Sequence, residues 1–179
     1  SADEKLDKIL REMKKRSDDH IREVEKILRD LDREVKEILK KDEKLLRDLD
    51  RRVKDVKRRR SSEETIDKLI KEAEKVLRDS EDEVRRVVEK MEKVLRDLER
   101  TLKELIERLE EIVKRLKEER SADDEVLKRV EETVRRLVEE NKKVLDRVRE
   151  EIRKLIEELR DSLRRSEKRI RELADELRR

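Results

Sequence analysis

Residues 24–41 read VEKILRDLDREVKEILKK, and the spacing of their apolar side chains indicates an amphipathic α-helix. Val24, Ile27, Leu28, Leu31 and Val35 recur every three or four residues, which places them on one face of an α-helix. The pattern returns after 18 residues, and LRDLDR occurs at both 28–33 and 46–51. An 18-residue period corresponds to 3.6 residues per turn, whereas a left-handed coiled coil shows 3.5. We therefore predict nearly untwisted helices.

A coarser repeat of 60 residues divides the chain into three similar segments. Each starts like a helix, with Ser as N-cap and acidic residues in the first turn. Basic residues precede each later start and end the chain, where cations complement the helix dipole. The starts are Ser1-Ala2-Asp3-Glu4, Ser61-Ser62-Glu63-Glu64 and Ser121-Ala122-Asp123-Asp124. We predict an all-α fold, an antiparallel up-down-up three-helix bundle of long helices, as one domain over 1–179 with helices at about 2–59, 62–119 and 122–178.

The composition excludes most other architectures and several kinds of site. The 179 residues include no Gly, Pro, Cys, Phe, Tyr or Trp, and 61% are charged. Without Gly the chain lacks the usual hairpin turns and phosphate-binding loops, and without Cys it lacks disulfides and thiolate ligands. The charged stretch from Ser1 to Leu10 does not read as a signal peptide, and no apolar run could span a membrane. We expect a soluble protein with no native compartment, cytoplasmic in an expression host, and no cofactor.

The charges are interspersed rather than gathered on one face. The net charge is only +3, and acid–base pairs such as Glu37/Lys41 and Glu104/Arg108 stand at helical i,i+4 spacing. A nucleic-acid interface needs a basic face or aromatic platforms, and a membrane-surface helix needs a strongly basic polar face. The basic run at 57–60, KRRR, is interpreted as a group of cations that interact favourably with the dipole at the C-terminal end of the first helix. It is not interpreted as a nuclear-import or phosphate-binding signal. We expect no nucleic-acid or membrane partner and no required partner of any kind.

Polar residues interrupt the apolar stripes at a few positions. In an up-down-up bundle with turns near residues 61 and 121, these positions gather at two levels. Two structural hydrogen-bond networks are therefore predicted. The first contains Ser17, His20, Thr101 and Asn141, and the second contains Asp42, Ser80, Ser162 and Ser166. A slipped helix would leave buried polar groups unpaired at about 1–3 kcal/mol each, so such layers select one register.

Two of these residues have alternative interpretations. His20 could be a metal ligand or a partly solvated residue at the stripe edge, although one His and no Cys make a structural zinc site a poor fit. Asp42 could turn outward to water, since burying a carboxylate is costly. A Ser–His–Asp triad needs hydrogen-bond reach, but His20 and Asp42 should lie tens of ångströms apart. No catalytic, cofactor-binding or metal-binding residues are predicted, and we expect no enzyme.

The chain resembles de novo designed helical bundles built from straight helices with hydrogen-bond networks in their cores. The resemblance covers the whole chain and rests on the 18-residue repeat, the Ser-Ala-Asp-Glu type starts, the missing aromatic residues and the two polar layers. It implies high thermal stability and an artificial, monomeric scaffold without evolved activity. The alternative is a helical interaction module, or the parent of a split heterotrimer, whose helices associate in trans.

Overall fold

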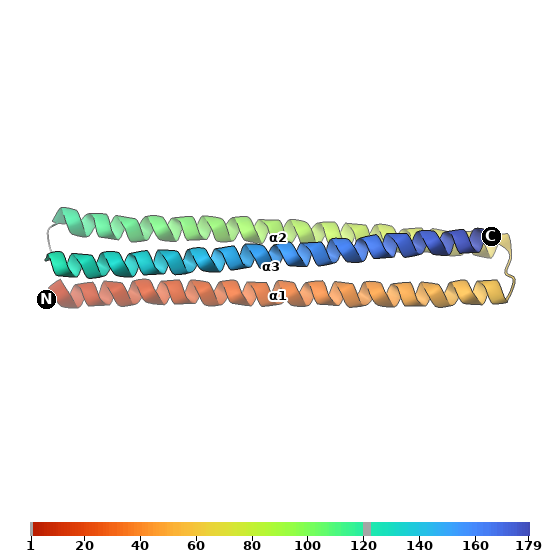
Figure 1. Cartoon of the computed structure of the whole chain (residues 1–179), viewed down its shortest axis with the longest axis horizontal. Helices are drawn as coiled ribbons and strands as arrows, with labels where there is room; N and C mark the ends of the chain where they lie inside the picture. Colours follow the sequence, from red (N-terminus) through yellow and green to blue (C-terminus); the bar gives the residue numbers. More distant parts are fainter. Residues whose placement is uncertain (1, 120–122) are drawn as a thin grey trace. The chain divides into compact units, whose positions relative to one another are not determined.

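The computed structural model describes residues 2–119 and 123–179, and in these ranges the chain forms helices joined by short connections (Figure 1). Helix α1 covers Ala2–Arg58, α2 covers Glu63–Glu119 and α3 covers Asp124–Arg178. The prediction of an all-α fold is confirmed. The starts predicted at Ser1 and Ser121 lie outside the described residues, as does residue 122, where the third helix was expected to begin.

Contacts within the chain define two compact units, each built from a segment of all three helices. The first unit contains Ser1–Arg29 and Glu92–Glu151, and the second contains Asp30–Met91 and Ile152–Arg179. Whether all 179 residues behave as one domain therefore stays a prediction.

Ion pairs between helices give the direction of the chain in the first unit. On α2 and α3, Lys117 pairs with Glu131 and Glu99 pairs with Arg149, so these two helices run antiparallel. In the same unit, Ser17 on α1 binds Asn141 on α3 and Glu25 pairs with Arg147 at 3.2 Å, with numbers that rise together, so α1 and α3 are parallel.

The second unit shows the same arrangement. Glu34 on α1 pairs with Lys90 on α2, and Lys41 pairs with Glu83, so α1 and α2 are antiparallel. Asp50 binds Arg169 and Lys57 binds Glu176, with numbers that rise together, so α1 and α3 are parallel. Both units therefore have the predicted up-down-up order.

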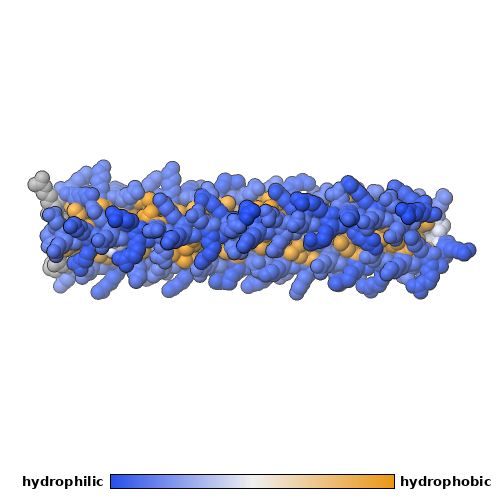
Figure 2. All heavy atoms as spheres, viewed as in Figure 1, coloured by the Kyte–Doolittle hydropathy of each residue, from blue (hydrophilic) through white to orange (hydrophobic). Residues whose placement is uncertain are grey.

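Each unit has an apolar core made from the predicted stripes, with residues from all three helices. In the first unit, the buried cluster contains Leu6, Met13, Leu109, Val126, Val130, Val134 and Leu137. In the second unit, it contains Leu49, Val53, Leu69, Ile70, Ala73, Ile170, Leu173 and Leu177. Because no large apolar side chain is exposed among the described residues, the stripes are covered by the chain itself. Figure 2 shows a mostly hydrophilic face with apolar atoms visible only between the charged side chains.

The end of α1 is closed without glycine. Arg60 has a φ of 48°, a left-handed conformation usually taken by Gly at this position. The Ser61 N–H donates to the Val56 carbonyl at 3.2 Å, and the Arg60 N–H donates to the Lys57 carbonyl at 3.4 Å. These two bonds form a Schellman motif, which satisfies carbonyl groups that the helix leaves unpaired.

The starts of α2 and α3 differ from the sequence prediction. At α2 the cap is Ser62 rather than Ser61, since its Oγ accepts a hydrogen bond from the Thr65 N–H at 3.3 Å. At α3, Asp123 is the cap, and its Oδ1 accepts from the Val126 N–H at 2.9 Å. In the first case the extended Schellman turn uses Ser61, so the helix starts one residue later.

Candidate functional site

The polar residues in the apolar stripes are the strongest candidates for a specific role. Six polar side chains are buried in the described residues, and all of them belong to the predicted layers. They are Ser17, Asp42, Ser80, Asn141, Ser162 and Ser166. His20 is half-buried and Thr101 is exposed. The four residues predicted for the first layer all lie in the first unit, and the four predicted for the second layer all lie in the second unit.

In the first unit, the structure joins Ser17 on α1 to Asn141 on α3. The Asn141 Nδ2 donates to Ser17 Oγ at 2.7 Å and also to the carbonyl oxygen of Leu137, one turn earlier, at 2.7 Å. Because a carbonyl can only accept, the Leu137 bond fixes the orientation of the amide. Asn141 Oδ1 therefore points away from both partners, and it is buried without a hydrogen-bond partner among the described protein atoms.

The other two residues predicted for this layer are placed differently. His20 lines a small cavity together with Asn141. Burial lowers the pKa of the His20 imidazole, and the nearby Glu23 carboxylate opposes this effect. Thr101 does not face the layer, because it is exposed and its hydroxyl donates to the Asp97 carbonyl of its own helix at 2.9 Å. A Thr hydroxyl in a helix readily bonds the carbonyl one turn earlier, which is why its position beside the stripe was misleading.

In the second unit, Ser80 on α2 is joined to Asp42 on α1. Ser80 Oγ donates to Asp42 Oδ1 at 3.3 Å, and the Asp42 side chain is only 4% exposed. Burial raises the pKa of the Asp42 carboxyl, and the Glu83 carboxylate adds to the rise. The Ser80 hydrogen bond and Lys41 oppose it. The alternative interpretation, in which Asp42 turns outward to water, is not what the structure shows.

The two serines of α3 lie in the same unit but make a different contribution. Ser162 is 7% exposed and Ser166 is 4% exposed. Among the described residues, the hydrogen bond at Asp42 comes from Ser80, and neither α3 serine is joined to Asp42 or Ser80. Their membership of a hydrogen-bond network stays a prediction.

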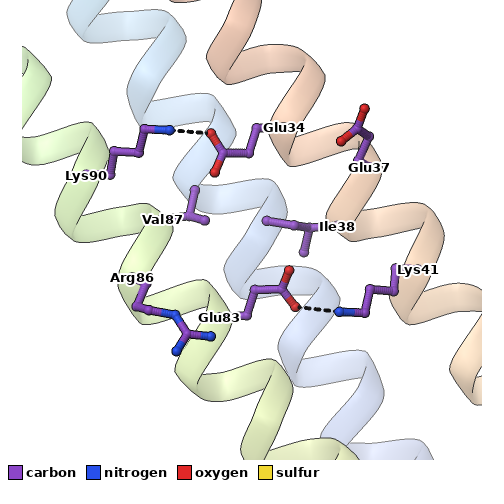
Figure 3. Close-up of a pocket in the computed structure, with 8 residues that line it drawn as sticks. All are labelled: Glu34, Glu37, Ile38, Lys41, Glu83, Arg86, Val87 and Lys90. Atoms are coloured by element: carbon purple, nitrogen blue, oxygen red, sulfur yellow. Dashed lines mark hydrogen bonds and ion pairs between the residues drawn. The ribbon is translucent and has the colours of Figure 1, made fainter.

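A surface groove of the second unit lies between α1 and α2 and has a volume of about 480 Å³. Figure 3 shows Ile38 and Val87 between two ion pairs of opposite direction. Glu34 on α1 accepts from Lys90 at 2.8 Å, and Lys41 on α1 donates to Glu83 at 3.4 Å. Exposed pairs of this kind contribute about 0.2–1 kcal/mol each.

These pairs between helices were missed by the sequence analysis. Lys41 was expected to pair with Glu37 on its own helix, but the structure pairs it with Glu83. The level-matching that located the polar layers also brings Glu34 near Lys90, within about one helical turn of 3.6 residues. Charge complementarity at matched levels was the signal that could have found them. Pairs along one helix do form elsewhere, such as Lys36 with Asp32 at 2.9 Å.

Two searches address other classes of site. Over residues 2–119 and 123–179, no group of three or more His, Cys, Asp or Glu side chains is arranged to hold a metal ion. In the same part of the chain, no helix has an apolar stretch long enough to cross a membrane.

Comparison with known proteins adds little to this description. No protein-family model and no curated protein sequence matches the chain. Among solved structures, one similar chain is described as a "Computationally designed three helix bundle". The match has 18% sequence identity and a TM-score of 0.42, and covers 98% of this chain and 88% of the other. At that identity and TM-score, the likeness supports no inference about function.

Proposed function

We propose that this chain is an artificial structural scaffold without evolved biochemical activity, in which the two buried polar layers specify helix register and pairing. One observation carries the proposal: four of the six buried polar side chains form hydrogen bonds between different helices. Ser17 is bonded to Asn141 between α1 and α3, and Asp42 is bonded to Ser80 between α1 and α2. In a wrong register these groups would face aliphatic side chains and lose about 1–3 kcal/mol each.

The energetic reason for such layers is selectivity rather than stability. Apolar stripes whose residues return every three or four positions can pack again after a slip of one or more helical turns, because similar side chains return to similar positions. A polar pair breaks this near-degeneracy, since it occurs once along its helix pair. Single polar core positions specify register in coiled coils by the same principle.

The proposal is tested by measuring register with and without a polar layer. The chain has no Cys, so a Lys44→Cys/Lys71→Cys variant carries spin labels at these two positions alone. Lys44 on α1 and Lys71 on α2 are both exposed positions of the second unit. In the labelled chain with both polar layers intact, we expect double electron–electron resonance to give one narrow distribution of the distance between the two labels. The Asp42→Leu/Ser80→Ala variant should stay folded but gain additional distance populations, in which the axial offset between α1 and α2 has changed by one or more helical turns of about 5.4 Å.

A matched control replaces an apolar core residue of the same unit. Leu49→Ile conserves volume at a buried site that carries no polar atom, and should keep the narrow distribution. If the Asp42→Leu/Ser80→Ala variant also keeps one narrow distribution, apolar packing and the connections set the register, and the proposed role is wrong.

We also propose that the chain is a monomer. Its support is the absence of large exposed apolar side chains among the described residues, because association in trans would need an uncovered apolar face. Light scattering coupled to size exclusion should give a mass near 22.0 kDa at low micromolar and at high concentration. A mass that rises with concentration would favour assembly between chains.

A further inference from the structure

The first unit contains a small cavity beside the buried amide of Asn141. Its volume is about 10 Å³, and His20 and Asn141 are the polar residues in its lining. Val24, Val144 and three leucines supply the rest of the wall. A space of this size holds one water molecule and nothing larger.

The hydrogen-bond inventory of Asn141 shows what the cavity would bind. Both hydrogens of Nδ2 are used, on Ser17 Oγ and on the Leu137 carbonyl. The Oδ1 atom is buried and has no partner among the described protein atoms, while the whole side chain is 3% exposed. The amide cannot be reversed to relieve this, because Oδ1 would then face the Leu137 carbonyl, which has no hydrogen to donate.

We propose that this cavity is a binding site for one structural water molecule, which bridges Asn141 Oδ1 and the His20 imidazole. The water donates one hydrogen to Oδ1. Its second contact is with a ring nitrogen of His20, which in the neutral imidazole offers one donor and one acceptor. The bridge brings His20 into the layer that already joins Ser17 to Asn141. The proposal goes beyond the scaffold role and does not depend on it.

The second unit supplies an internal comparison. It contains a cavity of the same volume, about 10 Å³, lined only by Leu, Ile, Val and Ala side chains, including Val53 and Ala73. Apolar cavities stay dry, since a buried water needs polar partners. If size alone decided hydration, the two cavities would behave alike. The proposal predicts that they differ.

The test uses water-to-methyl nuclear Overhauser effects on the full chain with labelled Val and Ala methyl groups. Carbon-bound protons do not exchange with solvent, so they report on nearby water. We expect cross-peaks at the water frequency for Val24 and Val144, with the sign of a long-lived water, and none for Val53 and Ala73. No cross-peaks at either cavity would overturn the proposal. Cross-peaks at both would overturn it too, because hydration would then not follow the polar lining.

A second measurement removes the ambiguity of proton exchange through the His20 ring or the Ser17 hydroxyl. Oxygen-17 relaxation dispersion counts long-lived water molecules directly. The Asn141→Leu variant should contain one long-lived water fewer than the unchanged chain. The control variant Leu49→Ile should contain the same number as the unchanged chain. An unchanged count in a folded Asn141→Leu variant would contradict the assignment, and the wild-type methyl measurement decides the question if that variant does not fold.

Discussion

The hydrogen bond between Ser80 and Asp42 allows a sharp test of the second polar layer. Ser80→Ala removes the one hydrogen bond that the structure gives to a carboxylate only 4% exposed. Hydrogen bonds to charged groups contribute about 1.5–3 kcal/mol and neutral ones about 0.5–1.5 kcal/mol. The Oγ–Oδ1 distance of 3.3 Å is long, so we take the lower end of each range. The expected loss is about 1.5 kcal/mol with Asp42 ionised and about 0.5 kcal/mol with Asp42 protonated.

The sign of the pH dependence follows from the raised pKa of Asp42. The folded state binds the proton of the Asp42 carboxyl group more tightly than the unfolded state, in which an ordinary Asp has a pKa of about 3.9. Asp42 therefore favours folding most below that value, and its contribution falls as the pH rises through the raised folded pKa. Removing the Ser80 hydroxyl raises the pKa of Asp42 further, because that hydrogen bond lowers it.

The assay is guanidinium denaturation followed by circular dichroism at pH 7 and near pH 3. With a slope of about 4 kcal/mol per molar, the midpoint of Ser80→Ala should fall by about 0.4 M at pH 7 and about 0.1 M at pH 3. The other titrating groups are shared by both proteins, so the difference isolates Asp42. In an Asp42→Asn background the effect of Ser80→Ala should not change with pH. Equal midpoint shifts at both pH values in the parent background would show that the Ser80 hydrogen bond is not coupled to the ionisation of Asp42.

Three further predictions concern single residues. Arg60→Gly should raise stability by about 0.5–1 kcal/mol, since Gly adopts the left-handed conformation freely; Arg59→Gly, outside that conformation, should lower it in the same thermal melts. Met91→Ala should lower the free energy of unfolding by about 2–5 kcal/mol in denaturant titrations, because Met91 is fully buried. A loss as small as that caused by the surface change Glu92→Ala would contradict the packing. His20, the only His in the sequence, should show by NMR a pKa below its ordinary value, because burial lowers it. Its contribution to folding stability is therefore lost as the pH falls through the folded-state pKa. A titration midpoint at or above about 6.5 would oppose this prediction.

The architecture could be predicted because it depends on short-range periodicity. An apolar stripe spaced every three or four residues can be buried only as a helix face, and the 60-residue repeat indicates where each helix ends. The six polar residues that the structure buries were also found from the stripes, because position within an 18-residue repeat fixes which face a residue occupies.

The errors arose where a side chain can choose between local and distant partners. Thr101 bonds a carbonyl of its own helix, and Lys41 reaches Glu83 on α2 rather than Glu37. The cap at Ser62 depends on where the preceding Schellman turn ends, with Arg60 left-handed. Each choice involves alternatives that differ by a fraction of a kcal/mol to about 1 kcal/mol, below what residue spacing distinguishes.

The helices, their order and the faces that are buried could be read from the amino-acid sequence, because they follow from a periodicity repeated many times along the chain. Which polar atoms meet depends on the tertiary structure. It bonded Ser17 to Asn141 and left the Asn141 oxygen unpaired among the described residues, beside a cavity that Asn141 and His20 line. It also buried Asp42 against the Ser80 hydroxyl, which donates to its carboxylate. Such pairings depend on rotamers and on the axial offset between helices to within about an ångström, since hydrogen bonds weaken steeply with distance and angle. No pattern along one helix carries that information.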